Sequence, residues 1–386
     1  MGNDRIKKIL YISGSRSDFG LMKNILKAIN NNSNFELEIL VTGMHLMKEF
    51  GNSIEEIKKE QFKIHKVQAI YEKDDKKSMS NFIGTAIKEM TEQIHKIEPD
   101  LILLLGDRAE MLAGAIVGTY LSILVAHIHG GDVSSTVDES VRHAITKLSN
   151  IHFAATEKSG ERIIRMGEKP SNVYVVGAPG IEQIVNSKLL SKEEIFKKYE
   201  LNINKPFILC IQHPVTLEFK KAGFQIKETL NAIVDLEIQS IVIYPNADAG
   251  GRKMIEIIKK YNKNHDFIKA YKNLPRKDYL SLIKYSDVIL GNSSSAIIES
   301  PSFKIPAINI GNRQKNREKT FNVIDVDYKK EEIRNGIEKA LFDIQFKKSI
   351  EDLTTPYGEG NTSKKIIDIM SKIYLNDDIL QKHLDY

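Results

Sequence analysis

Short, mostly apolar runs separated by helical patterns recur along this 386-residue chain. In the first half they cover residues 8–13, 35–41, 100–105, 122–128, 153–155 and 173–176. A strand that is apolar at every position has both faces buried, which is typical of a parallel sheet covered by helices on both sides. The pattern therefore predicts an α/β fold.

The same alternation begins again in the second half, with apolar runs at residues 207–211, 240–244, 287–290 and 307–310. Two doubly wound, Rossmann-like domains that meet at a cleft would explain this repetition. The breaker sequence Gly177-Ala-Pro-Gly180 marks the boundary, which gives a domain of residues 1–178 with most of the candidate proton-transfer groups and a nucleotide-binding domain of residues 179–361. Residues 362–374 have the apolar spacing of an amphipathic helix, and we expect the segment 362–386 to pack back toward the N-terminal domain.

Charge and cysteine content exclude several classes of protein. The formal net charge is only +5, and lysines and glutamates are interleaved, so the basic footprint of a nucleic-acid-binding protein is missing. Cys210 is the single cysteine and lies in an apolar run, which indicates a core residue without a disulfide.

Residues 111–128 approach the length of a membrane span. Their glycines and alanines, and the polar groups on either side, favour a buried helix followed by a buried strand, and we expect no membrane association. The N-terminus has no apolar signal-peptide core, so we expect a cytoplasmic protein.

The segment 106–143 gathers histidines, acids and arginines around a Gly-Gly turn. Most of these groups fall where predicted strands end and helices begin, and ligands bind at that edge of an open α/β sheet. Carboxylates and imidazoles gathered there indicate proton transfer on a bound substrate. The chain is therefore predicted to be an enzyme with its active site in the cleft between the domains.

Asp138 and Arg142 lie four residues apart, on one flank of a predicted helix. Thr136 and Glu139 have the spacing of a capping box at its start, so Glu139 is interpreted as a structural cap. The Asp138–Arg142 pair is either an ordinary ion pair of the helix surface or a part of the site. We favour the site because the pair follows the Gly-Gly turn directly.

The sequence around His127, His129 and Asp132 admits a second interpretation. Both rings of a His-x-His pair lie on one face of a strand, as metal ligands require. No further ligand motif completes such a site in the sequence, so we expect no metal ion. His127 is interpreted as structural, whereas His129 and Asp132 are candidates for acid–base chemistry.

Two loops have the composition of anion-binding sites. Gly291-Asn-Ser-Ser-Ser295 joins a predicted strand to a helical segment, so backbone N–H groups and the hydroxyls of Ser293 and Ser294 are available to a phosphate. Ordinary N-capping by serine is the alternative. Gly14-Ser-Arg-Ser-Asp18 offers Arg16 as a phosphate clamp or as a surface arginine, and because it is not G-x-G-x-x-G, a dinucleotide fingerprint is absent.

Two further residues of the second half are candidates for nucleotide binding. His213, in Gln212-His-Pro214, ends the first strand of that half and is placed to donate to a leaving diphosphate. Glu299 lies one turn beyond the serine loop and either accepts hydrogen bonds from ribose hydroxyls or faces solvent.

In their order and spacing these motifs resemble those of the hydrolysing UDP-N-acetylglucosamine 2-epimerases of bacterial sialic-acid synthesis, which have a glycosyltransferase-B-like fold. The resemblance covers nearly the whole chain. It rests on Gly14-Ser-Arg-Ser-Asp18, Val41-Thr-Gly-Met-His-Leu46, Leu105-Gly-Asp-Arg108, His127-Ile-His-Gly-Gly-Asp132, Arg142-His-Ala-Ile-Thr-Lys147, Gln212-His-Pro214, Gly291-Asn-Ser-Ser-Ser295 and Gly311-Asn-Arg-Gln314.

The resemblance implies loss of UDP with inversion at C2, through a glycal, so that UDP-N-acetylglucosamine and water give N-acetylmannosamine and UDP. It implies that Asp107 and Asp138 are the essential acids and that Arg142 orients Asp138. Many relatives have glutamate at the position of His129, and glutamate is also frequent at the position of Asp132. Nucleotide binding is implied for Arg16, Asp18, Arg108, His213, Ser293, Ser294, Glu299 and Arg313.

The family also implies no cofactor and a homo-oligomer, a dimer or a tetramer. Its non-hydrolysing members carry Gln-His-Glu where this chain has Gln212-His-Pro214, a departure that favours hydrolysis. Three alternatives stay open: the same reaction on UDP-2,4-diacetamido-2,4,6-trideoxy-glucose, a glycosyltransferase of the same fold, and a nucleotide-sugar sensor.

Overall fold

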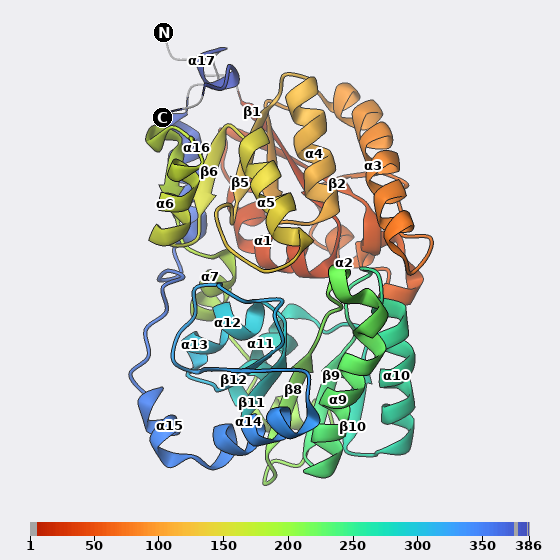
Figure 1. Ribbon diagram of the computed structural model, residues 1–386. Coiled ribbons are helices and arrows are strands. Elements are labelled where there is room, and N and C mark those ends of the chain that lie inside the picture. Colours follow the sequence, from red (N-terminus) through yellow and green to blue (C-terminus); the bar gives the residue numbers. More distant parts are fainter. Residues whose placement is uncertain (1–5, 374–376, 384, 386) are drawn as a thin grey trace.

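Two parallel sheets, one in each half of the chain, form the framework of the molecule (Figure 1). The computed structural model describes residues 6–373, 377–383 and 385. The first sheet contains β1 (Lys7–Ser13), β2 (Phe35–Val41), β3 (Lys63–Lys66), β4 (Leu101–Leu105), β5 (Leu124–Ile128), β6 (Ile151–Ala154) and β7 (Val173–Val175). The second contains β8 (Phe207–Ile211), β9 (Gln239–Ile243), β10 (Ile268–Tyr271), β11 (Val288–Gly291), β12 (Ala307–Ile310) and β13 (Val323–Val326).

The strand order is β3-β2-β1-β4-β5-β6-β7 in the first sheet and β10-β9-β8-β11-β12-β13 in the second. Each sheet therefore turns back after its first strand, as doubly wound folds do, and the paired strands all run parallel. The predicted α/β class with two Rossmann-like sheets is confirmed. The predicted boundary at residue 178 falls between β7 and the helix that begins at Pro179.

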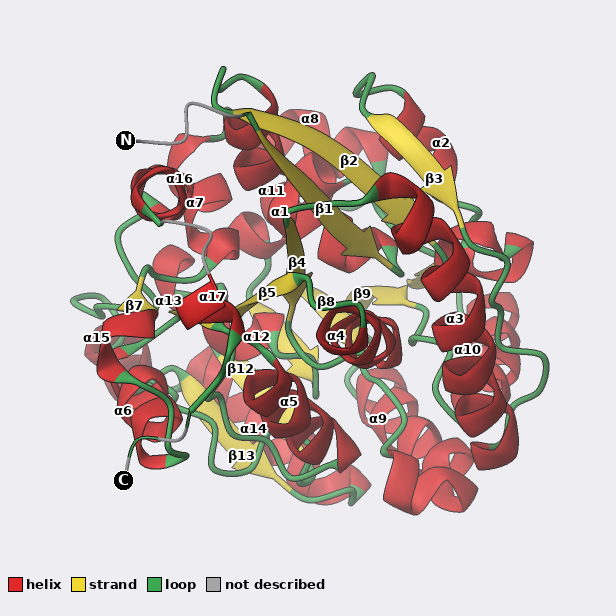
Figure 2. Cartoon of the chain, turned by 90° about the horizontal axis from the view of Figure 1, so that it is seen from above, coloured by secondary structure: helices red, strands yellow, loops and turns green. Residues whose placement is uncertain are grey.

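Helices cover both faces of each sheet (Figure 2). In the first half they are α1 (Arg16–Asn30), α2 (Ile54–Lys58), α3 (Lys76–Ile97), α4 (Ala109–Tyr120), α5 (Val137–Leu148) and α6 (Glu157–Arg165). From residue 179 on they are α7 (Pro179–Asn186), α8 (Lys192–Lys198), α9 (Ala222–Asp235), α10 (Gly251–Asn264), α11 (Arg276–Tyr285), α12 (Ser295–Ile298), α13 (Ser300–Phe303), α14 (Lys330–Phe342), α15 (Ile344–Ser349), α16 (Thr362–Lys372) and α17 (Asp377–Leu380).

Alternate residues of the central strands enter different cores, which explains why these strands are apolar throughout. Tyr11 of β1 packs with α1 and α16 on one side of the first sheet, and Leu10 packs with α3 and α4 on the other. In the second sheet, the adjacent residues Leu209 and Cys210 of β8 likewise enter opposite cores. Cys210 is a buried free thiol, as predicted, and burial raises its pKa to about 12.

The ten predicted strands are all present, but three further strands were not predicted. These are β3, β10 and β13, and each is an edge strand of its sheet. Their side chains are mostly only partly buried, so the apolar signal that marks the central strands is weak in them. The segment 111–128 forms most of α4 and then β5, as predicted, and none of the helices within the described residues is long and apolar enough to cross a membrane.

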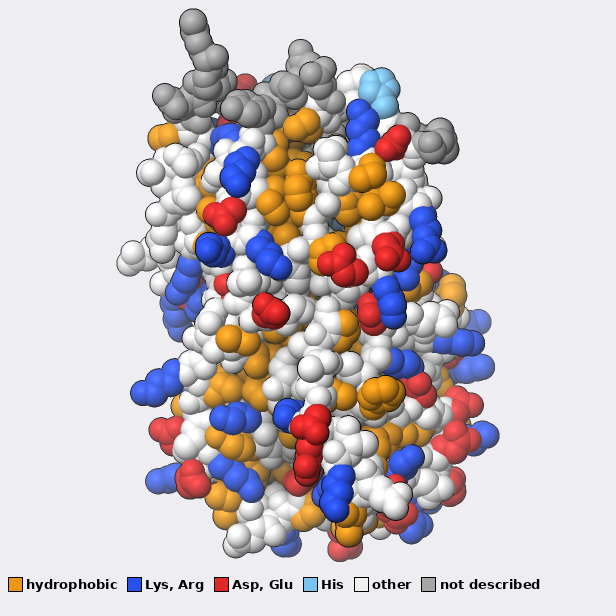
Figure 3. Space-filling model, turned by 90° about the vertical axis from the view of Figure 1, so that its left-hand side faces the viewer, with side chains coloured by type: hydrophobic (Ala, Val, Ile, Leu, Met, Phe, Trp, Pro, Cys, Tyr) orange, Lys and Arg blue, Asp and Glu red, His pale blue; other side chains and the backbone are white. Residues whose placement is uncertain are grey.

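Acidic and basic side chains alternate over the face shown in Figure 3, where they form no continuous basic surface. The mixed charge of this face agrees with the interleaving of lysines and glutamates in the sequence.

The chain returns to its first half at the end. Helix α16 packs against α1, with Ile366 and Met370 buried in the core beside Met22 (Figure 1). The Lys7 ammonium donates hydrogen bonds to the carbonyl oxygens of Met370, at 2.9 Å, and Ile373, at 2.7 Å. These contacts tie the end of the helix to the first strand.

Ile366→Ala tests how much this packing stabilises the N-terminal half. Because Ile366 is fully buried, we expect the free energy of unfolding to fall by about 2–5 kcal/mol, from lost burial and the cavity that remains. Lys365→Ala, an exposed neighbour on the same helix, is the control. Equal denaturation midpoints for the two variants would contradict the packing role.

Candidate active site

A cavity of about 360 Å³ lies between the two halves, lined by the loops that follow β1, β4 and β5 in the first sheet and β8, β9, β11 and β12 in the second. The carboxyl ends of both sheets therefore face each other. Of the predicted site residues, Asp138 alone is not in the cavity wall. All the other predicted site residues line the cavity, namely Arg16, Asp18, Asp107, Arg108, His129, Asp132, Arg142, His213, Ser293, Ser294, Glu299 and Arg313.

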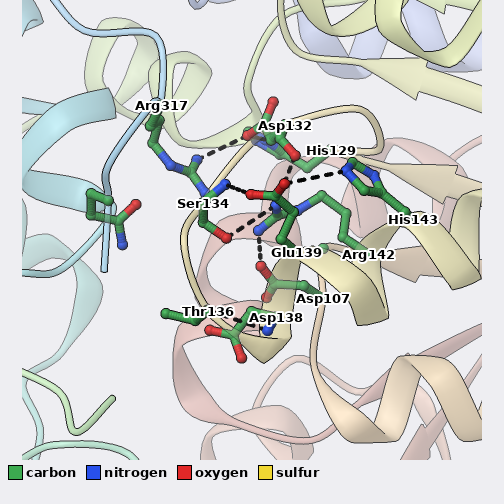
Figure 4. Close-up of polar contacts among 12 residues, drawn as sticks. Asp107, His129, Asp132, Ser134, Thr136, Asp138, Glu139, Arg142, His143 and Arg317 are labelled. Atoms are coloured by element: carbon green, nitrogen blue, oxygen red, sulfur yellow. Dashed lines mark hydrogen bonds and ion pairs between the residues drawn. The ribbon is translucent and has the colours of Figure 1, made fainter. Parts of the chain in front are cut away.

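Arg142 pairs with Asp107, so the prediction that it orients Asp138 is wrong (Figure 4). Its guanidinium donates to the Asp107 carboxylate and, at 2.8 Å, to the carbonyl oxygen of Asp132. The Arg142 side chain is 2% exposed, and it holds the loops after β4 and β5 against α5. Asp138 instead pairs with Arg313 of the second half, at 3.2 Å.

Asp107 and Asp138 lie near each other, yet their environments move their pKa values apart (Figure 4). Burial alone would raise the pKa of Asp107, but the Arg142 guanidinium and more distant arginines hold it below its usual value. Burial and the neighbouring charge of Asp107 raise the pKa of Asp138 to about 6. Two carboxylates separated in this way are suited to different roles in proton transfer.

Asp132 is a fixed anion beside His129. It accepts hydrogen bonds from Arg317, at 2.9 Å, and Ser159, at 2.8 Å, and the Arg317 charge holds its pKa well below the usual range despite burial. Its Oδ2 atom lies 3.2 Å from Nδ1 of His129, so it orients that ring. His129 has a φ of +64°, in the left-handed region that few non-glycine residues adopt. Asp132 therefore orients His129 and, because it stays ionised, is not suited to donate a proton.

At the start of α5, neither of the two reciprocal bonds of the predicted capping box forms. Thr136 caps the helix and accepts from the N–H of Asp138, at 3.2 Å, as an N-cap residue does. Glu139 accepts from the N–H of Ser134, at 2.6 Å, instead of the N–H of Thr136, so the predicted capping box does not form. Glu139 still stabilises the turn before the helix.

His127 is structural, as predicted. Its ring lies 2.8 Å from the carbonyl oxygen of Gly106 and 3.1 Å from the Thr146 hydroxyl. Burial lowers its pKa to about 3, so the ring is neutral. Among the described residues, no group of three or more potential His, Cys, Asp or Glu ligands is close enough to hold a metal ion.

Asp18 has a structural function that was not predicted. Its carboxylate accepts from the backbone N–H groups of Gly14, at 3.1 Å, and Ser15, at 2.6 Å, and from the Ser13 hydroxyl, at 2.5 Å. With Ser15 it completes a capping box on α1. These bonds occupy both carboxylate oxygens, so Asp18 shapes the loop, and its predicted contact with the nucleotide is not supported.

The two arginines of the first half that were predicted to bind the nucleotide line the cavity but already have partners. Arg16 contacts Glu56 and, across the cleft, Asn273. Arg108 lies 3.2 Å from the buried carboxylate of Glu110. Both arginines bring positive charge to the cavity wall.

In the second half, Ser293 and Ser294 lie in the loop between β11 and α12 and line the cavity. Helix α12 has only four residues, so its dipole contributes little to anion binding at this loop. Glu299 is buried and accepts from Arg276, at 2.6 Å, so it does not face solvent. Arg276 lies on α11 and has no motif that would single it out in the sequence.

His213 is a neutral hydrogen-bond donor on the cavity wall. The N–H of Asn246 donates to its Nδ1 atom at 3.2 Å, so the ring proton resides on Nε2. Burial, together with the positive charges of Arg313 and Arg108, lowers the pKa of His213 far below its usual value. Nε2–H is therefore free to donate without adding charge.

Sequence reasoning missed Arg317, which pairs with Asp132 across the cleft. A signal was present, because Arg317 lies four residues after Arg313 in the loop that follows β12. Loops after parallel strands approach the opposite carboxyl ends, so a second arginine there deserved the same weight as the first.

Two Rossmann-like sheets with a charged cavity between their carboxyl ends define an enzyme of the glycosyltransferase-B-like class. Comparison with known proteins agrees: the family model described as UDP-N-acetylglucosamine 2-epimerase matches residues 27–371. The chain belongs to the UDP-N-acetylglucosamine 2-epimerase family, and within it to the hydrolysing members.

Two relatives and one solved structure illustrate the similarity. A UDP-N,N'-diacetylbacillosamine 2-epimerase (hydrolyzing) of Legionella pneumophila is 41% identical over 98% of this chain and 99% of the relative. A UDP-N-acetylglucosamine 2-epimerase of Neisseria meningitidis is 36% identical over 87% of this chain and 88% of the relative. The crystal structure of UDP-GlcNAc 2-epimerase from Neisseria meningitidis bound to UDP-GlcNAc has the same fold, with a TM-score of 0.79, 19% identity, and coverage of 95% of this chain and 100% of that one.

Arg142→Met tests the buried ion pair. Removal of the guanidinium leaves the Asp107 carboxylate without its partner, so we expect the free energy of unfolding to fall by about 3 kcal/mol or more. Asp107→Asn in the same background is expected to recover part of that loss. Arg165→Met, whose side chain is 79% exposed, is the matched control and is expected to change little. Chemical denaturation of wild type, Arg142→Met, Asp107→Asn, their double variant and the Arg165→Met control measures these differences, and a double variant whose loss equals the sum of the two single losses would contradict the pairing.

Proposed function

We propose that this chain hydrolyses a UDP-linked 2-acetamido sugar with inversion at C2. The observation that carries the proposal is the location of Asp107 and His129 on the cavity wall, with Asp138 paired to Arg313 beside it, opposite the serine loop of the other half. One set of groups transfers protons, and the other binds the diphosphate. The enzyme class and the family of the chain support this division of roles.

In the proposed first step, Asp138 removes the proton on C2. The C–H electron pair forms a C1–C2 double bond, and the C1–O pair leaves with the β-phosphate of UDP. Asp138 suits this role because a carboxylate with a pKa of about 6 is a stronger base than Asp107 and is still ionised at neutral pH. Asp107, kept ionised by Arg142, stabilises the positive charge that develops at C1.

The leaving diphosphate is stabilised from the second half. The Nε2–H of His213, the hydroxyls of Ser293 and Ser294, and Arg313 line the cavity and supply hydrogen-bond donors and positive charge. Donors fixed before the reaction stabilise charge without reorganisation.

In the proposed second step, water adds across the double bond of the glycal. The water oxygen bonds to C1, and His129, held by Asp132, delivers a proton to C2 from the opposite face. The proton released by the water restores His129, and the proton taken by Asp138 passes to solvent. The products are UDP and the free sugar with inverted C2.

For the substrate, we propose UDP-N,N'-diacetylbacillosamine, which is UDP-2,4-diacetamido-2,4,6-trideoxy-glucose. The support is the 41% identity to the Legionella pneumophila relative named for that sugar. UDP-N-acetylglucosamine is the second candidate, supported by the 36% identity to the Neisseria meningitidis relative named for it. Both have the acetamido group at C2 and the diphosphate that the proposed mechanism requires.

Turnover in deuterium oxide with each substrate in turn tests this function. We expect release of UDP, a free sugar with inverted C2, and one deuterium on C2, because the proton delivered there comes from solvent. Coupled UDP detection and NMR of the product give these readouts. Retention of the original C2 hydrogen would favour a glycosyltransferase, and no UDP release from either sugar would refute the proposal.

The raised pKa of Asp138 predicts the acid limb of the pH profile. Only the carboxylate form accepts the C2 proton, so kcat/KM is expected to fall about tenfold per pH unit below about pH 6. Asp138→Asn is expected to lower kcat by about 10²-fold or more and to remove this limb. Asp352→Asn, an exposed acid, is the control whose profile stays unchanged. A wild-type profile that is flat between pH 5 and about pH 7 would contradict the assignment of Asp138 as base.

A further inference from the structure

The loop of residues 311–317, which follows β12, reaches across the cleft to the segment that begins α5. The N–H of Ser135 donates to the carbonyl oxygen of Arg313, and the Ser135 hydroxyl donates to that of Lys315, both at 3.3 Å. Arg313 and Arg317 of this loop then pair with Asp138 and Asp132. One loop of the second half thus contacts two acids of the first.

The two ion pairs differ in burial and in additional bonds. The side chains of Arg317 and Asp132 are 6% and 5% exposed, and Asp132 has a further hydrogen bond from Ser159. The side chains of Arg313 and Asp138 are 14% and 21% exposed and share a single contact of 3.2 Å. A buried pair whose acid accepts a further hydrogen bond resists opening, whereas a partly exposed pair with a single contact is more readily replaced. Only the Arg313–Asp138 pair is suited to exchange.

Arg313 also touches the serine loop. Its second terminal nitrogen donates to the carbonyl oxygen of Asn292, at 3.2 Å, directly before Ser293. The guanidinium therefore lies between Asp138 and the loop to which we assign the diphosphate. A diphosphate offers several charged oxygens to a planar guanidinium, and arginine binds phosphate oxygens in pairs more strongly than one carboxylate oxygen.

We propose that Arg313 is shared between Asp138 and the nucleotide diphosphate, so that binding of the nucleotide releases Asp138 for proton transfer. This proposal rests on the proposed function for the location of the diphosphate. It adds that Arg313 couples the two halves of the site: without nucleotide it neutralises the base, and with nucleotide it neutralises the leaving group.

Release of Arg313 changes the charges that Asp138 experiences. Besides Arg313, the groups that act on it are Asp107 after β4, Asp248 after β9 and Arg142 on its own helix. Asp107 and Asp248 favour the protonated form, and Arg313 opposes them. Once Arg313 has moved to the diphosphate, Asp138 binds a proton more tightly and is a stronger base. By linkage, nucleotide binding must then be accompanied by proton uptake.

Isothermal titration of the full chain with UDP, at about pH 7 in two buffers of different ionisation enthalpy, measures this uptake. We expect wild type to take up more protons per UDP than Asp138→Asn, by a fraction of one proton. The ionisation of free UDP is the same in the experiments with both proteins and cancels in the comparison. Arg313→Gln, measured at saturating UDP, is expected to lose most of the excess.

Lys315→Gln is the matched control, because it removes the same charge from the same loop at an exposed side chain. It is expected to retain the wild-type uptake. Equal uptake by wild type and Asp138→Asn, or by wild type and Arg313→Gln, would overturn the exchange, and Asp138→Ala replaces Asp138→Asn if that variant does not fold. Because the readout is UDP binding and not turnover, it separates this proposal from the proposed function, which fails instead when neither sugar nucleotide releases UDP.

Discussion

Burial of both faces of both sheets constrains where every other part of the molecule lies. Leu10 and Tyr11, adjacent on β1, enter opposite cores, and Leu209 and Cys210 do the same on β8. A charged side chain in the middle of such a strand would have to be buried without water, at a large cost. The functional groups therefore gather in the loops at the carboxyl ends of the strands. The two sheets turn these ends toward each other, and the cavity lies between them.

The gathered acids require compensation, because carboxylates held close together and away from water raise one another's pKa. Three arginines provide it, one for each acid: Arg142 for Asp107, Arg317 for Asp132 and Arg313 for Asp138. The pKa of each acid depends on the environment of its ion pair. Asp107 and Asp132 are held ionised, whereas Asp138, close to Asp107 and with a single contact to its arginine, keeps a pKa of about 6. The same residue types thus give two fixed anions and one group that titrates near neutrality.

The sequence was sufficient to predict the central strands and part of the cavity lining, but not Arg276 or Arg317, and not which side chains pair. Strands β3, β10 and β13 were missed because each contains a charged residue and is only partly buried, whereas the edge strand β7 is apolar throughout and was predicted. The spacing of Asp138 and Arg142 predicted an ion pair between them, yet Arg142 reaches a residue 35 positions earlier. That contact depends on how α5 packs against the loop after β4, and no local pattern encodes this packing.

The structural role of Asp18 was not predicted, although the sequence contained the signal for it. Ser15 and Asp18 have the spacing of a capping box at the start of a helix, the same signal that was used for Thr136 and Glu139. The capping box forms where it was not predicted and fails where it was, since Glu139 bonds to Ser134 instead. A capping motif inside a candidate binding loop thus has two possible uses. The hydrogen bonds to Ser13, Gly14 and Ser15 decide in favour of the structural one.

The location of the acids and the anion-binding loop on different sheets has a physical consequence for the cleft. Without a ligand, the acids of the first half repel one another, and so do the arginines of the second half. The ion pairs across the cleft therefore lower the electrostatic energy of both surfaces. By our proposal, a ligand with a diphosphate competes with Asp138 for Arg313. The buried pair of Arg317 and Asp132 keeps the loop of residues 311–317 attached while the more exposed Arg313 changes partner. Unequal burial of two similar ion pairs therefore lets one loop both join the two halves and respond to what binds between them.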